Sequence, residues 1–396
     1  MAIEGKSKEV TFNRKLRFGM VGGGRDAFIG AVHRAAAQFD GDAEIAAGCF
    51  SSTPEKSKAS GEDLFLDPNR VYGTYQEMAE AEAATSDDEK LDFVSVVTPN
   101  NFHFPIIKTF LEAGFNVVTD KPMTFDLDEA HKLGDIVKKS GKVFAVTYNY
   151  TGYPMVRQAR HMVKSGQLGK IQKVMVEFPQ DWLITRLEKE GVKQAVWRTD
   201  PKQAGAGGAL GDICTHAENM ANYVADLEID ELCADLTIFA KGRKLDDDCN
   251  VLVHYTNGAR GILSASQIST GNENGFNFRV FGTEGGLRWV QEDPNNLYYY
   301  KPGEPAQILT RNNGYLGESS LRASRIPPGH PEAFYEAFAN IYMNISDTIR
   351  ANLMGRKPTE LELEFPKYEE GLRGMQFIET AVQSHESKKK WTSLIK

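Results

Sequence analysis

The stretch FGMVGGGRDAFIGAVHR, residues 18–34, decides the fold. It runs from an apolar segment through three consecutive glycines into a segment with helical apolar spacing. Gly22, Gly24 and Ala27 have the G-x-G-x-x-G/A spacing of dinucleotide-binding turns between a strand and a helix. In such a turn Gly22 would allow the tight bend, Gly24 the approach to a pyrophosphate, and Ala27 close helix packing. An ordinary strand-to-helix turn is the alternative, and we prefer the dinucleotide site because strand, glycines and helix coincide.

Short apolar runs alternate with amphipathic stretches through the first part of the chain. We predict strands at residues 16–21, 44–50, 92–97, 115–120 and 142–148, with helices between them. Apolar strands separated by helices are typical of a doubly wound parallel α/β sheet that is covered on both faces. Residues 16–147 are therefore predicted to form a dinucleotide-binding Rossmann domain.

The pattern changes after Thr147. Residues 249–267 and 276–291 are long stretches in which apolar and polar side chains alternate. Asn257-Gly258 inside the first stretch is a hairpin signal, and Gly285-Gly286 marks a turn in the second. We predict that residues 148–396 form an α+β domain for substrate binding and oligomerisation. Its large, mostly antiparallel, open-faced sheet would carry helices on one face.

The composition narrows the class of protein. The chain has 396 residues, more than one hydrophobic core usually serves, which favours two domains. A net charge of -8 without a strong basic block gives little support for nucleic-acid binding. The four cysteines form no C-x-x-C pair, so we expect no metal site, no disulfide framework and a reducing, cytoplasmic location. Residues 1–15 read as a polar exposed arm, and no apolar run is long enough to suggest a membrane.

The end of the second predicted strand bears on the choice of nucleotide. Enzymes that bind NAD often carry an acid there for the ribose hydroxyls, but residues 48–54 contain none. Ser51 can hydrogen-bond a ribose hydroxyl or a phosphate. Lys56 could pair with a 2′-phosphate or could equally be a solvated helix lysine, so NADP stays open.

Two further positions carry groups suited to acid-base chemistry. Pro122 keeps Lys121 out of helical geometry at the carboxyl edge of the sheet, where ligands of α/β folds bind. A cation there can stabilise an alkoxide as hydride leaves the same carbon. A surface lysine is the alternative.

Asp212 and His216 stand four residues apart in GGALGDICTHAENM, residues 207–220. On a helix they would share a face, with His216 taking a hydroxyl proton and Asp212 binding a neighbouring hydroxyl. The more ordinary reading of this stretch alone is a helix cap at Asp212 and a core histidine.

Four segments together resemble the Gfo/Idh/MocA family of oxidoreductases: residues 20–34, 96–105, 112–122 and 207–220. The likeness extends from Leu16 to the C-terminus. The family's E-K-P motif is matched by Asp120-Lys121-Pro122, with a shorter acid, and its D-x-x-x-H motif by Asp212 and His216. The resemblance implies catalytic roles for Lys121, Asp212 and His216, with His216 as proton acceptor. It favours NAD, although Ser51 and Lys56 look like the S-x-x-x-x-K of NADP-binding members. The cofactor residues that it implies are Gly22, Gly24, Ala27, Phe28, Ile29, Ser51, Ser52, Lys56, Thr98, Asn100, His103, Asp120 and Lys121.

Residues 151–154, 178–183 and 325–342 look most like a subgroup that oxidises cyclic sugars, including levoglucosan dehydrogenase and enzymes that make 3-keto-glycosides. That likeness implies a substrate pocket lined by Lys121, Tyr153, Gln180, Trp182, Asp212, His216, Arg325 and His330. Tyr153 and Trp182 could otherwise be core aromatics, and His330 could be a helix-entry residue. His103 could simply begin the helix that follows the fourth apolar run.

The leading hypothesis is hydride transfer from a secondary ring hydroxyl of a sugar, glycoside or cyclic polyol to nicotinamide. In a second hypothesis the oxidation is transient. The ring hydroxyl is oxidised to a ketone, the glycosidic bond is broken by elimination, and the ketone is then reduced again. A third reading is a sugar- or nucleotide-sensing regulator that keeps the fold without catalysis. The open sheet face predicts a homodimer or homotetramer.

Overall fold

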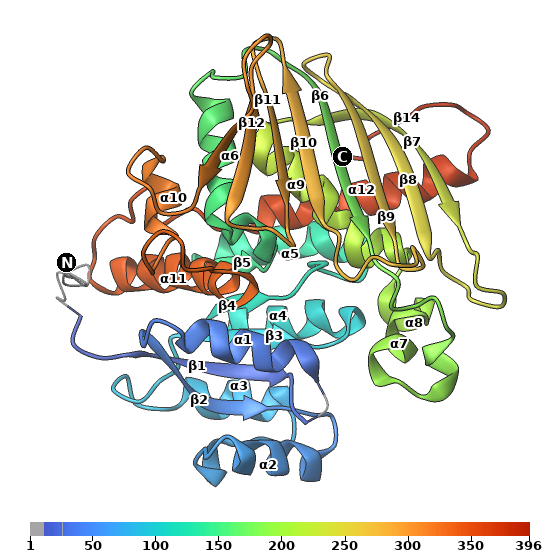
Figure 1. The fold of residues 1–396 in the computed structure, drawn as a ribbon. Coiled ribbons are helices and arrows are strands. Elements are labelled where there is room, and N and C mark those ends of the chain that lie inside the picture. Colours follow the sequence, from blue (N-terminus) through green and yellow to red (C-terminus); the bar gives the residue numbers. More distant parts are fainter. Residues whose placement is uncertain (1–11, 26) are drawn as a thin grey trace.

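A computed structural model describes residues 12–25 and 27–396 of the chain. Most of the predicted N-terminal arm, residues 1–11, lies outside the described residues. The strands of the described part form two sheets, one of five strands and one of nine (Figure 1).

The first sheet is parallel throughout, in the order β2-β1-β3-β4-β5. Every residue of β3 is buried, because helices cover both faces. The predicted doubly wound domain is confirmed. Its strands are β1 (Leu16–Gly22), β2 (Ala43–Cys49), β3 (Phe93–Val97), β4 (Asn116–Thr119) and β5 (Phe144–Val146). Its helices are α1 (Phe28–Gln38), α2 (Pro54–Asp63), η1 (Pro68–Arg70), α3 (Tyr75–Ala83), η2 (Asn100–Phe102), α4 (His103–Glu112) and α5 (Leu127–Ser140).

The glycine turn between β1 and α1 depends on the absence of side chains. Gly22 has φ +83°, and a Cβ there would lie 2.7 Å from the Val97 carbonyl oxygen. A Cβ on Gly30 would lie 2.3 Å from the Cα of Gly23. The sequence pattern predicted the close contact between helix and turn at Ala27. The structure instead places this contact at Gly30, three residues further along the chain.

The second sheet has the order β13-β12-β11-β10-β6-β9-β8-β7-β14. The β6–β9 pair is parallel and the other neighbours are antiparallel, as the prediction of a mostly antiparallel sheet requires. Gly258, with φ +88°, turns the predicted hairpin. The strands are β6 (Ile171–Pro179), β7 (Ile229–Thr237), β8 (Asp248–Tyr255), β9 (Arg260–Ser266), β10 (Asn277–Gly282), β11 (Gly286–Val290), β12 (Asn296–Tyr300), β13 (Gln307–Thr310) and β14 (Thr392–Ser393).

Helices of the second half cover one face of this sheet. α6, α9 and α12 pack against its strands, and no described helix lies on the opposite face (Figure 1). α11 instead packs against α1, where the His33 and Phe338 rings are 4.7 Å apart, so a late segment also covers the first sheet. The remaining elements are η3 (Asn149–Gly152), α6 (Pro154–Lys164), η4 (Leu187–Glu190), α7 (Lys193–Arg198), α8 (Pro201–Ala204), η5 (Leu210–Cys214), α9 (Thr215–Ala225), α10 (Glu318–Arg322), α11 (Phe334–Leu353) and α12 (Tyr368–Glu386).

Among the helices of the described residues, none is long and apolar enough to cross a bilayer.

Candidate active site

Two neighbouring cavities lie where the carboxyl ends of the parallel strands face the second half of the chain. The first, of about 490 Å³, extends from the glycine turn past the end of β2 to Lys121. This is the position at which open α/β sheets bind ligands. The predicted cofactor residues that line it are Gly22, Gly24, Ala27, Ile29, Ser51, Ser52, Thr98, Asn100, Asp120 and Lys121.

The second cavity, of about 510 Å³, lies between α1 and the nine-stranded sheet. Aromatic rings and carboxamides make up most of its wall. The aromatic residues are Phe28, Tyr150, Phe178, Trp182, Phe334 and Phe338, and the carboxamides are Asn149, Gln180, Gln194, Asn274 and Gln291. Three of the carboxamides form a chain, in which Gln180 donates to Asn274 (2.8 Å) and Asn274 to Gln291 (3.0 Å).

The two cavities share one wall, made by Ile29, Asp120, Lys121, Gln194, Arg198 and Asp212. Lys121 follows β4 and its side chain reaches across to η5. Its Nζ donates to the backbone carbonyl and, at 3.0 Å, to Oδ1 of Asp212. A cation and a carboxylate therefore meet between the two cavities.

Asp212 lies in a π-helical turn, η5, directly before α9. Such turns are rare and recur at functional sites. Its Oδ2 accepts hydrogen bonds from Gln267 (2.8 Å) and Arg198 (3.1 Å). Burial raises the pKa of this carboxyl, but Arg198 and Lys121 outweigh it and hold the pKa below its ordinary value. The alternative that Asp212 caps a helix is wrong, because its carboxylate binds side chains rather than backbone N–H groups.

His216 lies in the first turn of α9 and lines the second cavity. Aromatic rings surround it, with Tyr150 perpendicular at a centroid distance of 4.8 Å. Burial and the nearby Lys121 ammonium lower the pKa of His216 well below its ordinary value, so the imidazole is neutral at pH 7. Within the described chain no hydrogen bond engages its ring nitrogens. The ring is therefore able to accept a proton from a group bound in the cavity.

Comparison with known proteins identifies the architecture. Residues 16–148 match the model described as the oxidoreductase family with an NAD-binding Rossmann fold, and residues 156–288 match the GFO/IDH/MocA C-terminal domain. The uncharacterized oxidoreductase YfiI of Bacillus subtilis is 35% identical over 97% of this chain and 98% of its own length. The chain belongs to the Gfo/Idh/MocA family.

Solved structures of the family agree. An inositol dehydrogenase homolog from Azotobacter vinelandii, complexed with NAD+, is 35% identical with a TM-score of 0.92, covering 97% of this chain and 98% of its own. An inositol dehydrogenase homolog from the same organism, complexed with NADH and myo-inositol, is 34% identical with a TM-score of 0.89, covering 96% of this chain and 98% of its own. Levoglucosan dehydrogenase from Pseudarthrobacter phenanthrenivorans is 28% identical over 53% of this chain and 58% of its own length.

The first domain is thus the NAD-binding Rossmann domain of an oxidoreductase of this family. The residues present fit that nucleotide, because Gly22, Gly23 and Gly24 line the first cavity directly before α1. Phosphate oxygens bound there would lie against backbone N–H groups that no glycine side chain covers, and at the positive end of the α1 dipole. Bound NAD supplies the hydride acceptor or donor.

Several cofactor candidates lie elsewhere in this Gfo/Idh/MocA chain. Phe28 lines the second cavity and not the first. Lys56 is exposed on α2 and lines neither cavity. His103 is fully buried at the start of α4, and its ring nitrogens lie 2.8 Å and 2.9 Å from the carbonyl oxygens of Pro122 and Thr98. It connects the segments after β3 and β4 instead of lining the cavity.

Of the substrate candidates, Gln180 and Trp182 line the second cavity beside Lys121, Asp212 and His216. Tyr153 is buried behind the wall, where its hydroxyl accepts a hydrogen bond from Gln291 (3.1 Å).

Two further substrate candidates do not reach that cavity. Arg325 donates two hydrogen bonds to Asp40, at 2.7 Å and 2.6 Å, and one to Asn340, and lies outside the cavity. His330 is exposed in the loop before α11.

Sequence reasoning missed Arg198, Gln194 and Asn274, all of which line the second cavity. Their segments carry no motif, and only the hydrogen bonds formed after folding reveal them. No group of three or more His, Cys, Asp or Glu side chains in the described residues could hold a metal ion.

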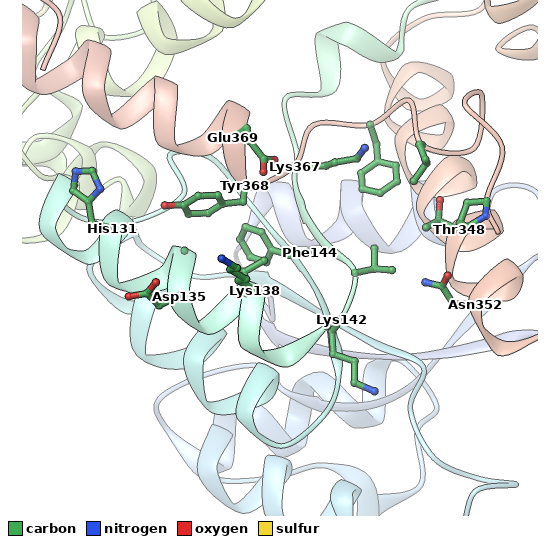
Figure 2. A pocket seen from close by; sticks show the side chains of 17 residues that line it. His131, Asp135, Lys138, Lys142, Phe144, Thr348, Asn352, Lys367, Tyr368 and Glu369 are labelled. Carbon is green, nitrogen blue, oxygen red and sulfur yellow. The ribbon is translucent and has the colours of Figure 1, made fainter. Parts of the chain in front are cut away.

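A third depression, of about 720 Å³, lies between α5, α11 and the start of α12 (Figure 2). Lys138, Lys142, Phe144 and Tyr368 are among the residues that line it. It opens beside the start of β5, away from the carboxyl ends of the strands, and none of the predicted site residues lines it.

Proposed function

We propose that the protein is an NAD-dependent dehydrogenase that oxidises a secondary hydroxyl on the ring of a sugar, glycoside or cyclic polyol. The proposal rests mainly on one observation. The amine of Lys121 and the carboxylate of Asp212 meet at the boundary between the nucleotide cavity and a second cavity, and the neutral imidazole of His216 lines that second cavity.

The proposed chemistry assigns one task to each group. His216 accepts the hydroxyl proton at a ring nitrogen while hydride leaves the same carbon for the bound nucleotide, so that the alcohol becomes a ketone. The Lys121 ammonium donates a hydrogen bond to the reacting oxygen and stabilises negative charge that develops there. Asp212 accepts a hydrogen bond from a neighbouring hydroxyl and fixes the ring orientation.

The wall of the second cavity suits a neutral ring with many hydroxyl groups. Carboxamides both donate and accept hydrogen bonds, as hydroxyls do, while aromatic rings such as Trp182 pack on the C–H faces of a ring. The myo-inositol complex of the Azotobacter homolog and the relationship to levoglucosan dehydrogenase support this substrate class. The proposal includes oxidation at C3 to a 3-keto sugar as one form of this reaction.

We also propose that the protein is a homodimer or homotetramer and works in the cytoplasm. The outer face of the nine-stranded sheet exposes Leu252, Phe281, Tyr300 and Ile308 on four different strands. An apolar surface of this kind is normally covered, and a second copy covers it symmetrically.

The decisive experiment offers inositols, hexoses, anhydrosugars and glycosides with NAD and with NADP. Absorbance of reduced nicotinamide and NMR of the product are followed together. Net NADH with an equivalent ring ketone supports the proposal. Release of the aglycone without net NADH replaces it with redox-assisted cleavage, and tight binding without any turnover replaces it with a sensing role.

A further inference from the structure

Arg198 lines both cavities, yet it belongs to no motif. It ends α7, in the excursion of residues 180–205 that leaves β6 and returns to η5. Figure 1 shows α7 and α8 beside the edge of the first domain, and Asn100 donates to the Ala204 carbonyl (2.8 Å) to tie them there. The excursion therefore covers the boundary at which nucleotide and substrate would meet.

Arg198 makes both hydrogen bonds and aromatic contacts through its guanidinium. Nε donates to Oδ2 of Asp212 (3.1 Å), and Nη1 donates to the carbonyl (3.2 Å) and to Oε1 (2.6 Å) of Gln194. Its planar group also lies over the rings of Trp197, at 4.2 Å, and Trp182, at 5.9 Å. A planar guanidinium that is held by hydrogen bonds to Gln194 and by contact with tryptophan rings is well suited to orient a carboxylate.

The Asp212 carboxylate is consequently held at both oxygens. Lys121 binds Oδ1, while Arg198 and Gln267 bind Oδ2. A carboxylate held at one oxygen can rotate, but one held at both has a fixed plane. The Lys121 ammonium is bound to Oδ1 of this carboxylate and also to the Asp212 backbone carbonyl, so the plane of the carboxylate sets one of its two acceptors.

We propose that Arg198 is a positioning residue for the reaction, orienting the Asp212 carboxylate and, through it, the Lys121 ammonium at the boundary between the cavities. The chemical meaning of this role rests on the proposed function. The effect of the Arg198 charge on the pKa of His216 does not rest on the proposed function, because both groups are present whether or not a sugar is oxidised.

Several charged or titratable groups face His216 and share in any change at Arg198. Lys121 and Asp120 come from the segment after β4 and Asp212 from η5, while the Tyr150 ring comes from η3 and the Tyr148 ring from the residue before it. Arg198 acts on His216 through Asp212. If the positive charge of Arg198 is removed, the negative charges of Asp120 and Asp212 are opposed only by the Lys121 ammonium. The pKa of His216 then rises.

The test compares Arg198→Gln, Arg198→Lys and Arg186→Gln. Arg186 is a matched control because it lies in the same excursion, pairs with Glu188 at 3.2 Å and lines neither cavity. We expect Arg198→Gln to lower kcat about 100-fold on the ring alcohol that the wild type oxidises best, as misplaced reacting groups do. Arg186→Gln should stay within two-fold of the wild type.

A readout that does not depend on turnover is the NMR titration of the His216 ring. Arg198→Gln should move its midpoint to higher pH, whereas Arg198→Lys, which retains the charge, should restore the midpoint but only part of kcat. The proposal is overturned if Arg198→Gln matches Arg186→Gln in both kcat and titration. A second pair of results also overturns the proposal. If Arg198→Lys equals the wild type in kcat and in the His216 titration, and Arg198→Gln becomes sensitive to proteolysis at residues 180–205, then Arg198 serves only to hold this segment in place.

The two proposals fail differently. If the wild type oxidises no ring alcohol, the proposed function is wrong, while the His216 titration still decides whether Arg198 sets the electrostatics of this site. An unchanged titration in Arg198→Gln would then overturn the inference on its own.

Discussion

The ammonium of Lys121 lies 3.0 Å from Oδ1 of Asp212, although 91 residues separate them in the chain. Lys121 follows a strand of the first sheet, and Asp212 lies in the π-helical turn that leads to His216. The contact therefore joins the nucleotide side of the site to the side where the substrate is proposed to bind.

The first prediction concerns the coupling of this pair. Lys121→Met and Asp212→Asn should each lower kcat/KM about 100-fold or more, because each removes a charge from the boundary between the cavities. The double variant should lose much less than the product of the two losses, since the side chains act as one unit. Steady-state kinetics of all four proteins measures the coupling, and losses that simply multiply would contradict it.

His216→Ala should lower kcat by about 10² to 10⁴, the usual contribution of a general base, and change NADH affinity little. Since the pKa of His216 lies well below its ordinary value, kcat/KM should stay level through neutral pH and fall only below the usual histidine range. Protonation at low pH removes the acceptor. His131→Ala, an exposed position outside both site cavities, is the control. Unchanged turnover in His216→Ala would remove this residue from the mechanism.

Gly24→Val should weaken nucleotide binding about 10-fold or more. A Cβ at this position would lie 2.8 Å from the Phe50 carbonyl oxygen, so the turn must shift away from the geometry that admits a pyrophosphate. Titration of NADH fluorescence measures the affinity, and circular dichroism checks the fold. Gly314→Val, where a Cβ meets nothing within 4 Å, should bind NADH like the wild type. Equal affinity in both variants would show that the glycine turn does not hold the nucleotide.

Glu218 should make the protein less stable as pH rises. Burial outweighs Arg373 and raises the pKa of Glu218 to about 7, above the ordinary value of 4.5. Its contribution to folding is therefore complete below pH 4.5 and is lost as pH rises through 7, by on the order of 1–3 kcal/mol. Glu218→Gln should flatten the pH dependence of Tm in this range, and the exposed Glu304→Gln should not. A slope that persists in Glu218→Gln would assign it to other groups.

Phe281→Glu should dissociate the proposed oligomer by placing a charge on the open face of the sheet. Phe65→Glu is the control, because Phe65 is also exposed but lies just after α2, away from that sheet. Light scattering measures the mass of each protein. A wild-type monomer, or an oligomer that survives Phe281→Glu, would contradict the proposed interface.

Much of the fold could be predicted because it rests on local pattern. Apolar runs gave the five parallel strands, and Asn257-Gly258 gave the β8–β9 hairpin, since these features depend on backbone preferences within a few residues. Motif spacing also singled out Lys121, Asp212 and His216, whose side chains the structure brings to adjoining walls.

Resemblance was less informative about the rest of the pocket. Tyr153 lies behind Gln291, and Arg325 is paired with Asp40, which lies 285 positions away in the chain. Whether such a side chain faces a cavity depends on partners from other elements, which the local sequence does not specify. Arg198 was missed for the same reason.

The sequence by itself determined the elements, the glycine turn and the chemical groups available for a reaction. Only the tertiary structure decided which groups meet, that Arg198 and Gln267 share the Asp212 carboxylate, and that His216 is neutral beside a cavity. Local preferences act over a few residues, whereas the position and protonation of these groups depend on packing between distant segments and on the burial that this packing creates.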